Sequence, residues 1–182
     1  MNVAQLADEN IARFGEYTSL VFEDQEFTNV RMDQVARRLG SALKKLGVKR
    51  GDRVVVQLPN CPEALQSFQG VWKLGAAIVP ISFLMGEEET AHIYQDSGAV
   101  AVVTSSDSLE KAQRARLKAP HVRNLILVDG GAPDSLDYGR LVEEASGELE
   151  TVETADDELA ILIYTAGTTG KPKGVMHSHY TL

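Results

Sequence analysis

One stretch near the end of the chain combines the residue types that bind phosphate groups. It runs from Tyr164 to Gly174 and reads Tyr-Thr-Ala-Gly-Thr-Thr-Gly-Lys-Pro-Lys-Gly. Glycines can take positive φ and leave backbone N–H groups uncovered, so several amides can converge on one anion. Hydroxyl and ammonium groups add further donors and two positive charges. A polyphosphate is the ligand that suits this set: Gly167, Thr168, Thr169, Gly170, Lys171, Lys173 and Gly174.

The residues before and within this stretch indicate how it is positioned. Positions 159–163 form a short, uncharged, apolar and partly β-branched run, which predicts a buried strand. In α/β sheets, ligands bind beyond the carboxyl ends of such strands. Pro172 favours an extended backbone, in which residues two apart point to the same side. We therefore expect Lys171 and Lys173 to face one ligand.

Two other kinds of segment also contain glycine next to lysine. An ordinary Gly/Thr/Lys surface loop would explain a lone Gly-Lys pair, but not this whole run at the end of a strand. A P-loop NTPase needs the pattern G-x-x-x-x-G-K-[ST]. Here only two residues separate Gly167 from Gly170, and Pro172 follows Lys171. The spacing excludes the P-loop.

The run from Tyr164 to Val175 resembles the phosphate-binding signature of the adenylate-forming enzymes. These include acyl-CoA synthetases, aryl-CoA ligases, luciferases and the adenylation domains of peptide synthetases. Their usual form is Tyr-Thr-Ser-Gly-Thr-Thr-Gly-Lys-Pro-Lys-Gly-Val, from which this chain departs only at Ala166. The missing hydroxyl removes a contact of roughly 0.5–1.5 kcal/mol, while the backbone N–H of Ala166 remains. The resemblance adds Ala166 and Thr165 to the site, with Thr165 as a ligand of Mg²⁺.

Three earlier segments, at positions 47–54, 58–63 and 73–80, also resemble acyl-CoA synthetases, the fatty-acid–CoA ligases among them, in pattern and order. Packing explains each of them taken alone: Gly47 as a helix stop, Asn60 as a helix cap and Pro80 at a strand end. We assign them structure and not chemistry. The resemblance therefore spans most of the chain.

The resemblance implies a ligase that uses ATP, Mg²⁺ and coenzyme A. In such enzymes a small carboxylic acid attacks the α-phosphorus of ATP, diphosphate leaves, and the coenzyme A thiol takes the acyl group. The parts that hold coenzyme A and supply the catalytic lysine have no counterpart in residues 1–182, so no catalytic residue is assigned. We expect the N-terminal portion of the large AMP-binding domain, without the C-terminal domain and inactive alone. Leu182 would lie inside the next helix.

Two further hypotheses belong to other classes of protein. The chain could be a complete small nucleotide-binding module, or a non-catalytic interaction domain that has the same fold. The expected helix at Leu182 favours the first hypothesis, a part of a larger ligase.

Charge and composition limit the classes of molecule that the chain is expected to bind. The chain has 182 residues, is 43% hydrophobic and carries a net charge of −8. All of that imbalance lies in an acidic connector at about 143–158, which has eight acids and no Lys or Arg. We expect a solvated connector, and bulk charge argues against nucleic acid and anionic membranes as partners.

No sequence feature predicts a targeting or transmembrane segment. The first residues are polar and acidic, and no apolar run approaches the length of a membrane span. Cys61 is the only cysteine, so an internal disulfide is impossible, as suits a reducing compartment. We expect a cytoplasmic protein, in which Cys61 contributes to packing.

Hydrophobic periodicity predicts alternating helices and strands. The expected helices are 3–14, 32–46, 62–74, 87–96, 108–118 and 138–145, and the expected strands are 19–23, 26–28, 53–58, 77–81, 100–104, 124–128 and 159–163. Strands separated by helices of this length imply parallel pairing. The predicted fold is α/β and three-layered, with mainly parallel sheets, in one domain.

Overall fold

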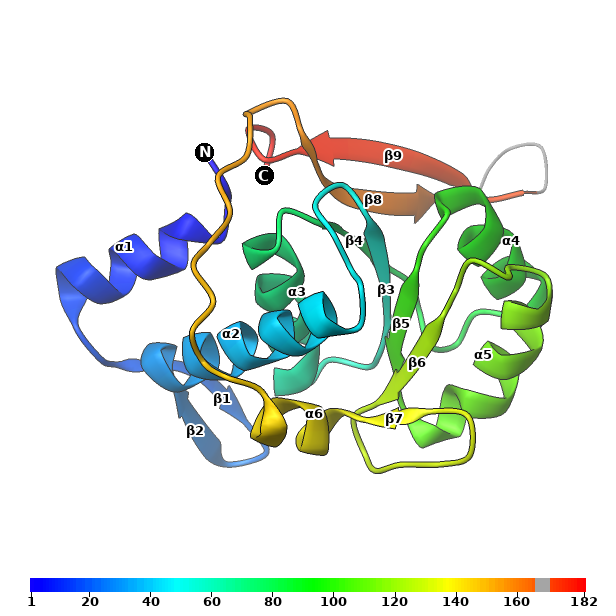
Figure 1. Ribbon diagram of the computed structural model, residues 1–182, viewed down its shortest axis with the longest axis horizontal. Coiled ribbons are helices and arrows are strands. Elements are labelled where there is room, and N and C mark those ends of the chain that lie inside the picture. The colour runs from blue at the N-terminus through cyan, green and yellow to red at the C-terminus, as the bar shows by residue number, and fades with distance from the viewer. Residues whose placement is uncertain (166–170) are drawn as a thin grey trace.

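The computed structural model describes residues 1–165 and 171–182. Its main sheet has seven strands in the order β7-β6-β5-β3-β4-β8-β9 (Figure 1). All neighbours pair in parallel except β8 and β9, which are antiparallel. The strands are β3 (Arg53–Gln57), β4 (Ala77–Pro80), β5 (Ala101–Thr104), β6 (Asn124–Leu127), β7 (Leu136–Asp137), β8 (Leu159–Thr165) and β9 (Lys173–Ser178).

Helices cover both faces of this sheet, so the predicted three-layered α/β fold is confirmed (Figure 1). On one face lie α2 (Asn29–Lys45), α3 (Pro62–Lys73) and α6 (Tyr138–Glu144). On the other lie α4 (Glu87–Ser97) and α5 (Ser106–Leu117). Side chains alternate along a strand, so Val54 packs with the first group and Val55 with the second.

The N-terminal region forms a separate small layer beside α2. It contains α1 (Gln5–Phe14) and a hairpin of β1 (Thr18–Phe22) and β2 (Gln25–Thr28). Thr28 then caps α2, because its hydroxyl accepts a hydrogen bond from the N–H of Arg31 at 3.1 Å. This region follows the predicted order of helix, hairpin and helix.

The start of α3 differs from the prediction. Its N-cap is Cys61, and no side chain caps the helix there, so the assignment of this role to Asn60 was wrong. Pro62 still begins the helix, where a missing N–H costs nothing. Burial raises the pKa of the Cys61 thiol, which agrees with a packing role for this residue.

The sequence predicted a solvated acidic connector, but the structure shows that part of the connector is packed against the core. Leu149 is buried in the core beside α2, and its carbonyl oxygen accepts a hydrogen bond from Arg37 at 2.5 Å. The N–H of Val152 donates to the carbonyl oxygen of Lys73 at 2.9 Å. Glu148 and Glu150, on either side of Leu149, are exposed. The number of acidic residues therefore could not reveal that the backbone between them is packed.

A cluster of charges holds α1, α2, α3 and the connector together. This Lys73 cluster consists of Asp8, Asp33, Arg37, Lys73 and Thr151. Lys73 is 0% exposed, and its Nζ lies 2.9 Å from Asp8 Oδ1, 2.8 Å from Asp33 Oδ1 and 3.3 Å from Thr151 Oγ1. Burial acts to raise the pKa of Asp8, but hydrogen bonds from Lys73 and Thr151 outweigh it and lower that pKa. A buried ammonium needs partners of this kind.

Candidate functional site: the tip of the β8–β9 hairpin

The two ends of the candidate phosphate-binding stretch, residues 164–174, lie side by side in neighbouring strands. Tyr164 pairs with Gly174 and Thr165 with Lys173, so β8 and β9 bring the stretch back on itself. The sequence predicted the first strand and missed the second. Its remaining candidates, Ala166, Gly167, Thr168, Thr169 and Gly170, lie outside the described residues.

Burial along β8 changes from core to surface toward the site. Ala160, Ile161 and Leu162 are buried, whereas Thr165 is exposed. Because β8 runs parallel to β4, its exposed end lies at the carboxyl edge of the parallel strands. This is the edge where α/β sheets bind ligands.

The two lysines of the stretch are available to an anion. Lys171 and Lys173 are both exposed, and neither forms an ion pair with any residue in the ranges 1–165 and 171–182. Neither ammonium group is therefore tied to a carboxylate by a described ion pair, although Lys171 lines a hollow together with Glu88 and Glu89. A phosphate chain is a fitting counter-ion.

Gly174 lies at a close approach between the two strands. It is in β9 and does not use the positive φ that a glycine can adopt. A Cβ atom there would lie 2.9 Å from Leu162 Cδ1 and 3.3 Å from Tyr164 Cζ. Gly174 therefore permits close packing of β9 over the side chains of β8.

Helix α4 contacts both ends of the stretch, which sequence reasoning missed. The hydroxyl of Tyr164 donates a hydrogen bond to Asp96 Oδ2 at 2.6 Å. His92 Nε2 lies 3.1 Å from the carbonyl oxygen of Pro172. A single histidine and a single aspartate on a predicted helix carry no spacing signal, so only the tertiary structure reveals these contacts. In Figure 1, α4 lies beside the ends of β8 and β9.

The described residues fit Mg²⁺ only as a partner of bound phosphates. Thr165 offers one exposed hydroxyl oxygen at the end of β8, a hard donor of the type that Mg²⁺ prefers. In the part of the chain that the structure describes, no three His, Cys, Asp or Glu residues are grouped to hold a metal. Mg²⁺ commonly keeps its waters and binds through one or two protein oxygens plus substrate phosphates.

His179, which follows the hairpin, has a structural role. Its side chain is 5% exposed, and its Nδ1 accepts a hydrogen bond from the N–H of Val3 at 3.2 Å. Burial lowers the pKa of His179, which favours the neutral ring that this bond requires. The histidine thus fastens the N-terminus to the end of β9.

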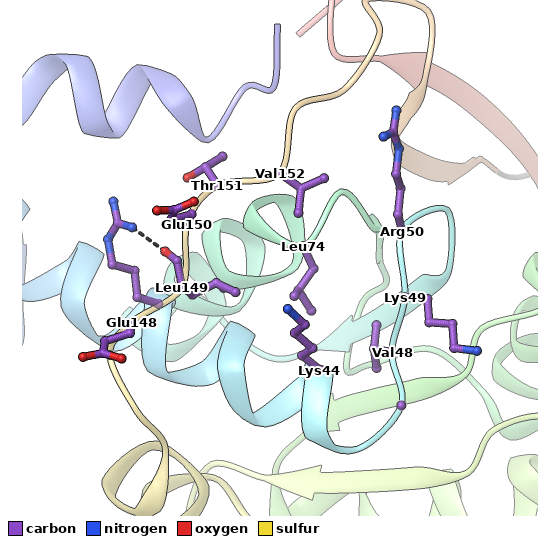
Figure 2. Close-up of a pocket in the computed structure, with 13 residues that line it drawn as sticks. Lys44, Val48, Lys49, Arg50, Leu74, Glu148, Leu149, Glu150, Thr151 and Val152 are labelled. Atoms are coloured by element: carbon purple, nitrogen blue, oxygen red, sulfur yellow. Dashed lines mark hydrogen bonds between the residues drawn. The ribbon is translucent and has the colours of Figure 1, made fainter.

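A hollow of about 1130 Å³ lies elsewhere, between the end of α2 and the connector (Figure 2). Leu149 and Val152 of the connector line one part of it, and Lys44 and Val48 line another. Its residues 47–50 precede β3, which places the hollow toward the amino ends of the parallel strands. It is therefore separate from the carboxyl edge where β8 ends.

None of the helices formed by residues 1–165 and 171–182 is long and apolar enough to cross a membrane.

Comparisons with known proteins agree with this geometry. The family described as AMP-binding enzyme matches residues 7–182. A crotonobetaine/carnitine–CoA ligase from Salmonella typhi is 31% identical over all of this chain, and a 3-hydroxybenzoate/4-hydroxybenzoate–CoA ligase from Thauera aromatica is 29% identical over 95% of it. The chain spans 37% and 34% of those relatives. It aligns with the N-terminal part of such ligases.

Solved structures show the same fold. An anthranilate CoA ligase in complex with anthranoyl-AMP superposes with a TM-score of 0.94 and 28% identity, over 99% of this chain and 35% of that one. The inhibitor-bound N-terminal domain of FACL13 from Mycobacterium tuberculosis gives a TM-score of 0.86 and 30% identity, over 98% of this chain and 44% of that one. Both are far longer than the chain described above.

Proposed function

The chain belongs to the AMP-binding enzyme family, and we propose that it is the N-terminal, phosphate-binding part of an AMP-forming acyl-CoA synthetase. The full reaction converts a carboxylic acid, ATP and coenzyme A into acyl-CoA, AMP and diphosphate through an acyl-adenylate. The observation that carries the proposal is the paired stretch from Tyr164 to Gly174 at the carboxyl edge of the sheet. The CoA ligases among its relatives support the reaction class.

The stretch would contribute positioning and charge to adenylate formation. Phosphoryl and nucleotidyl transfers depend mostly on holding the phosphates in line and neutralising charge as the leaving group departs. Lys171 and Lys173 would neutralise the phosphates, and the backbone and hydroxyl donors of positions 165–170 would orient them. When bound with ATP, Mg²⁺ would supply further charge neutralisation, and Thr165 is the residue that would contact it.

Coenzyme A and the carboxylic acid would be bound mainly by other parts of the ligase. The longer relatives contain sequence beyond the third that this chain matches. We place the enzyme in the cytoplasm, because a lone cysteine such as Cys61 is typical of proteins in a reducing compartment.

Titration of the ¹⁵N-labelled chain with Mg-ATP tests the proposal. We expect weak binding, with a Kd on the order of millimolar, because exposed charges compete with water and salt. Shifts should concentrate on amides near Thr165, Lys171 and Lys173. Mg-AMP is the control, since it lacks the β- and γ-phosphates. Equal shifts with both nucleotides, or none at these amides, would contradict a polyphosphate site.

A coupled assay with short, long and aromatic acids tests the assignment to a larger catalytic unit. We expect no acyl-CoA from residues 1–182 alone, because proximity of the reactants can supply roughly 7–11 kcal/mol of a barrier. The chain matches only 37% and 34% of two CoA ligases, so most of the groups that would hold the reactants together lie in the rest of such ligases. Turnover by this chain would overturn that assignment.

A further inference from the structure

Resting on the proposed function, we propose that His92 and Asp96 of helix α4 are positioning residues for the phosphate-binding stretch. They lie four residues apart, so they share one face of the helix. Asp96 contacts Tyr164, near the end of β8, and His92 contacts Pro172, just before the start of β9. One helix face therefore fixes both ends of a ligand-binding segment.

The His92 contact holds a residue that the hydrogen bonds between β8 and β9 do not reach. The ladder between β8 and β9 ends at the Thr165–Lys173 pair, and Pro172 lies immediately beyond it. Proline has no N–H, so its carbonyl oxygen is its only backbone hydrogen-bonding group. Because a carbonyl only accepts, His92 Nε2 must carry the proton and donate it. Without this bond, the residue next to Lys171 would have no described anchor.

The Asp96 contact is a charge-assisted hydrogen bond from a phenol. Such O–H···O⁻ bonds are stronger than neutral ones. Burial and the neighbouring carboxylate of Asp96 both raise the pKa of Tyr164, so its hydroxyl stays protonated and keeps donating. Tyr164 is thus tied to α4 by its side chain and to Gly174 by the strand pairing. Both contacts fix the position of Tyr164, which immediately precedes Thr165 in the proposed site.

Helix α4 is a firm support because its opposite face is buried. Ile93 and Tyr94 lie between His92 and Asp96 in sequence and are both 0% exposed. The hydroxyl of Tyr94 donates to Gln57 Oε1 at 2.9 Å, which fixes α4 to the end of β3. Supporting groups on a rigid element keep a site within the narrow geometry that it needs. The contacts of His92 and Asp96 therefore hold the ends of β8 and β9 against a helix that is itself fixed in the core.

Amide hydrogen exchange of the ¹⁵N-labelled chain, followed by titration with inorganic magnesium triphosphate, tests this role. We expect Asp96→Ala and His92→Ala each to speed exchange at Lys171, Lys173 and Gly174 by about three- to tenfold, the effect of losing one partly exposed hydrogen bond. Triphosphate affinity should fall by about the same factor. Amides of β3 should not change.

Conservative variants and a matched control separate positioning from general stability. Asp96→Asn keeps an acceptor and His92→Gln keeps a donor, so both should restore slow exchange and affinity. Asp107→Ala, an exposed change on the neighbouring helix α5, should alter neither. Tyr164→Phe combined with Asp96→Ala should have no larger effect than either change alone, because both remove one bond.

The two measurements have separate outcomes. Unchanged exchange in both alanine variants would overturn the positioning role, whatever the chain binds. Faster exchange with unchanged triphosphate affinity would also overturn it. If the unaltered chain does not bind triphosphate, the proposed polyphosphate site fails, while the exchange data still decide whether α4 holds the hairpin ends.

Discussion

Lysines in two regions of the molecule have opposite surroundings. Lys73 is wholly buried and lies near three oxygen-bearing partners, Asp8, Asp33 and Thr151. Lys171 and Lys173 are exposed and have no ion-pair partner among the described residues. A buried charge must be compensated within the fold, whereas an exposed one is available to a ligand. The comparison shows that burial, and not residue type, separates stabilising charges from candidate binding charges.

The largest effect should come from breaking the Lys73 cluster. Lys73→Met leaves Asp8 and Asp33 without their shared ammonium partner, and removing one member of a buried pair costs about 3 kcal/mol or more. Urea unfolding followed by circular dichroism measures this loss. Lys49→Met is the control, an exposed change that should stay within about 0.5 kcal/mol. Equal effects of the two variants would contradict the comparison.

Gly174→Ala should destabilise the chain by about 1–3 kcal/mol without any ligand present. The added methyl group would overlap Leu162 and crowd the ring of Tyr164, and overpacking costs energy of this size. Thermal unfolding measures this loss of stability. The control is Gly147→Ala, where the new Cβ would approach only the Arg38 side chain at 3.9 Å. If the two variants unfold alike, close packing does not explain Gly174.

The exposed lysines should affect binding more than stability. Lys171→Gln and Lys173→Gln should each weaken Mg-ATP binding by about threefold, since exposed ion pairs contribute up to about 1 kcal/mol. The free energy of unfolding should change by less than about 0.5 kcal/mol. Titrations at low and high salt provide a second test, because screening should shrink the difference between variant and unaltered chain.

The smallest effect concerns an ion pair at the end of the connector. Hydrogen bonds from Arg50 and from the N–H of Ala155 lower the pKa of Glu158 from 4.5 to about 2. A depressed pKa contributes stability that is present above 4.5 and is lost as the pH falls toward 2. Glu158→Gln should therefore cost stability at pH 6, and the cost should shrink at pH 3. Urea unfolding at both values, with exposed Glu148→Gln as control, measures this.

By itself, the sequence determined the fold class, the order of nearly all the elements and the stretch that we propose to bind phosphate. Hydrophobic periodicity records which face of each element is buried, and a long run from Tyr164 to Val175 has a spacing that few other chemistries share. The family match to residues 7–182 agrees with that run. These features are local, so they are readable along the chain.

Only the tertiary structure decided which distant residues meet. The packing of Leu149 within an acidic connector, the partners of Lys73 and the contacts of His92 and Asp96 join positions that lie far apart in the chain. β9 was missed because its residues show little apolar alternation and pair mainly with β8. The reason is physical: the energies of these contacts depend on distance and burial, which arise only when the sheet and its helices have assembled.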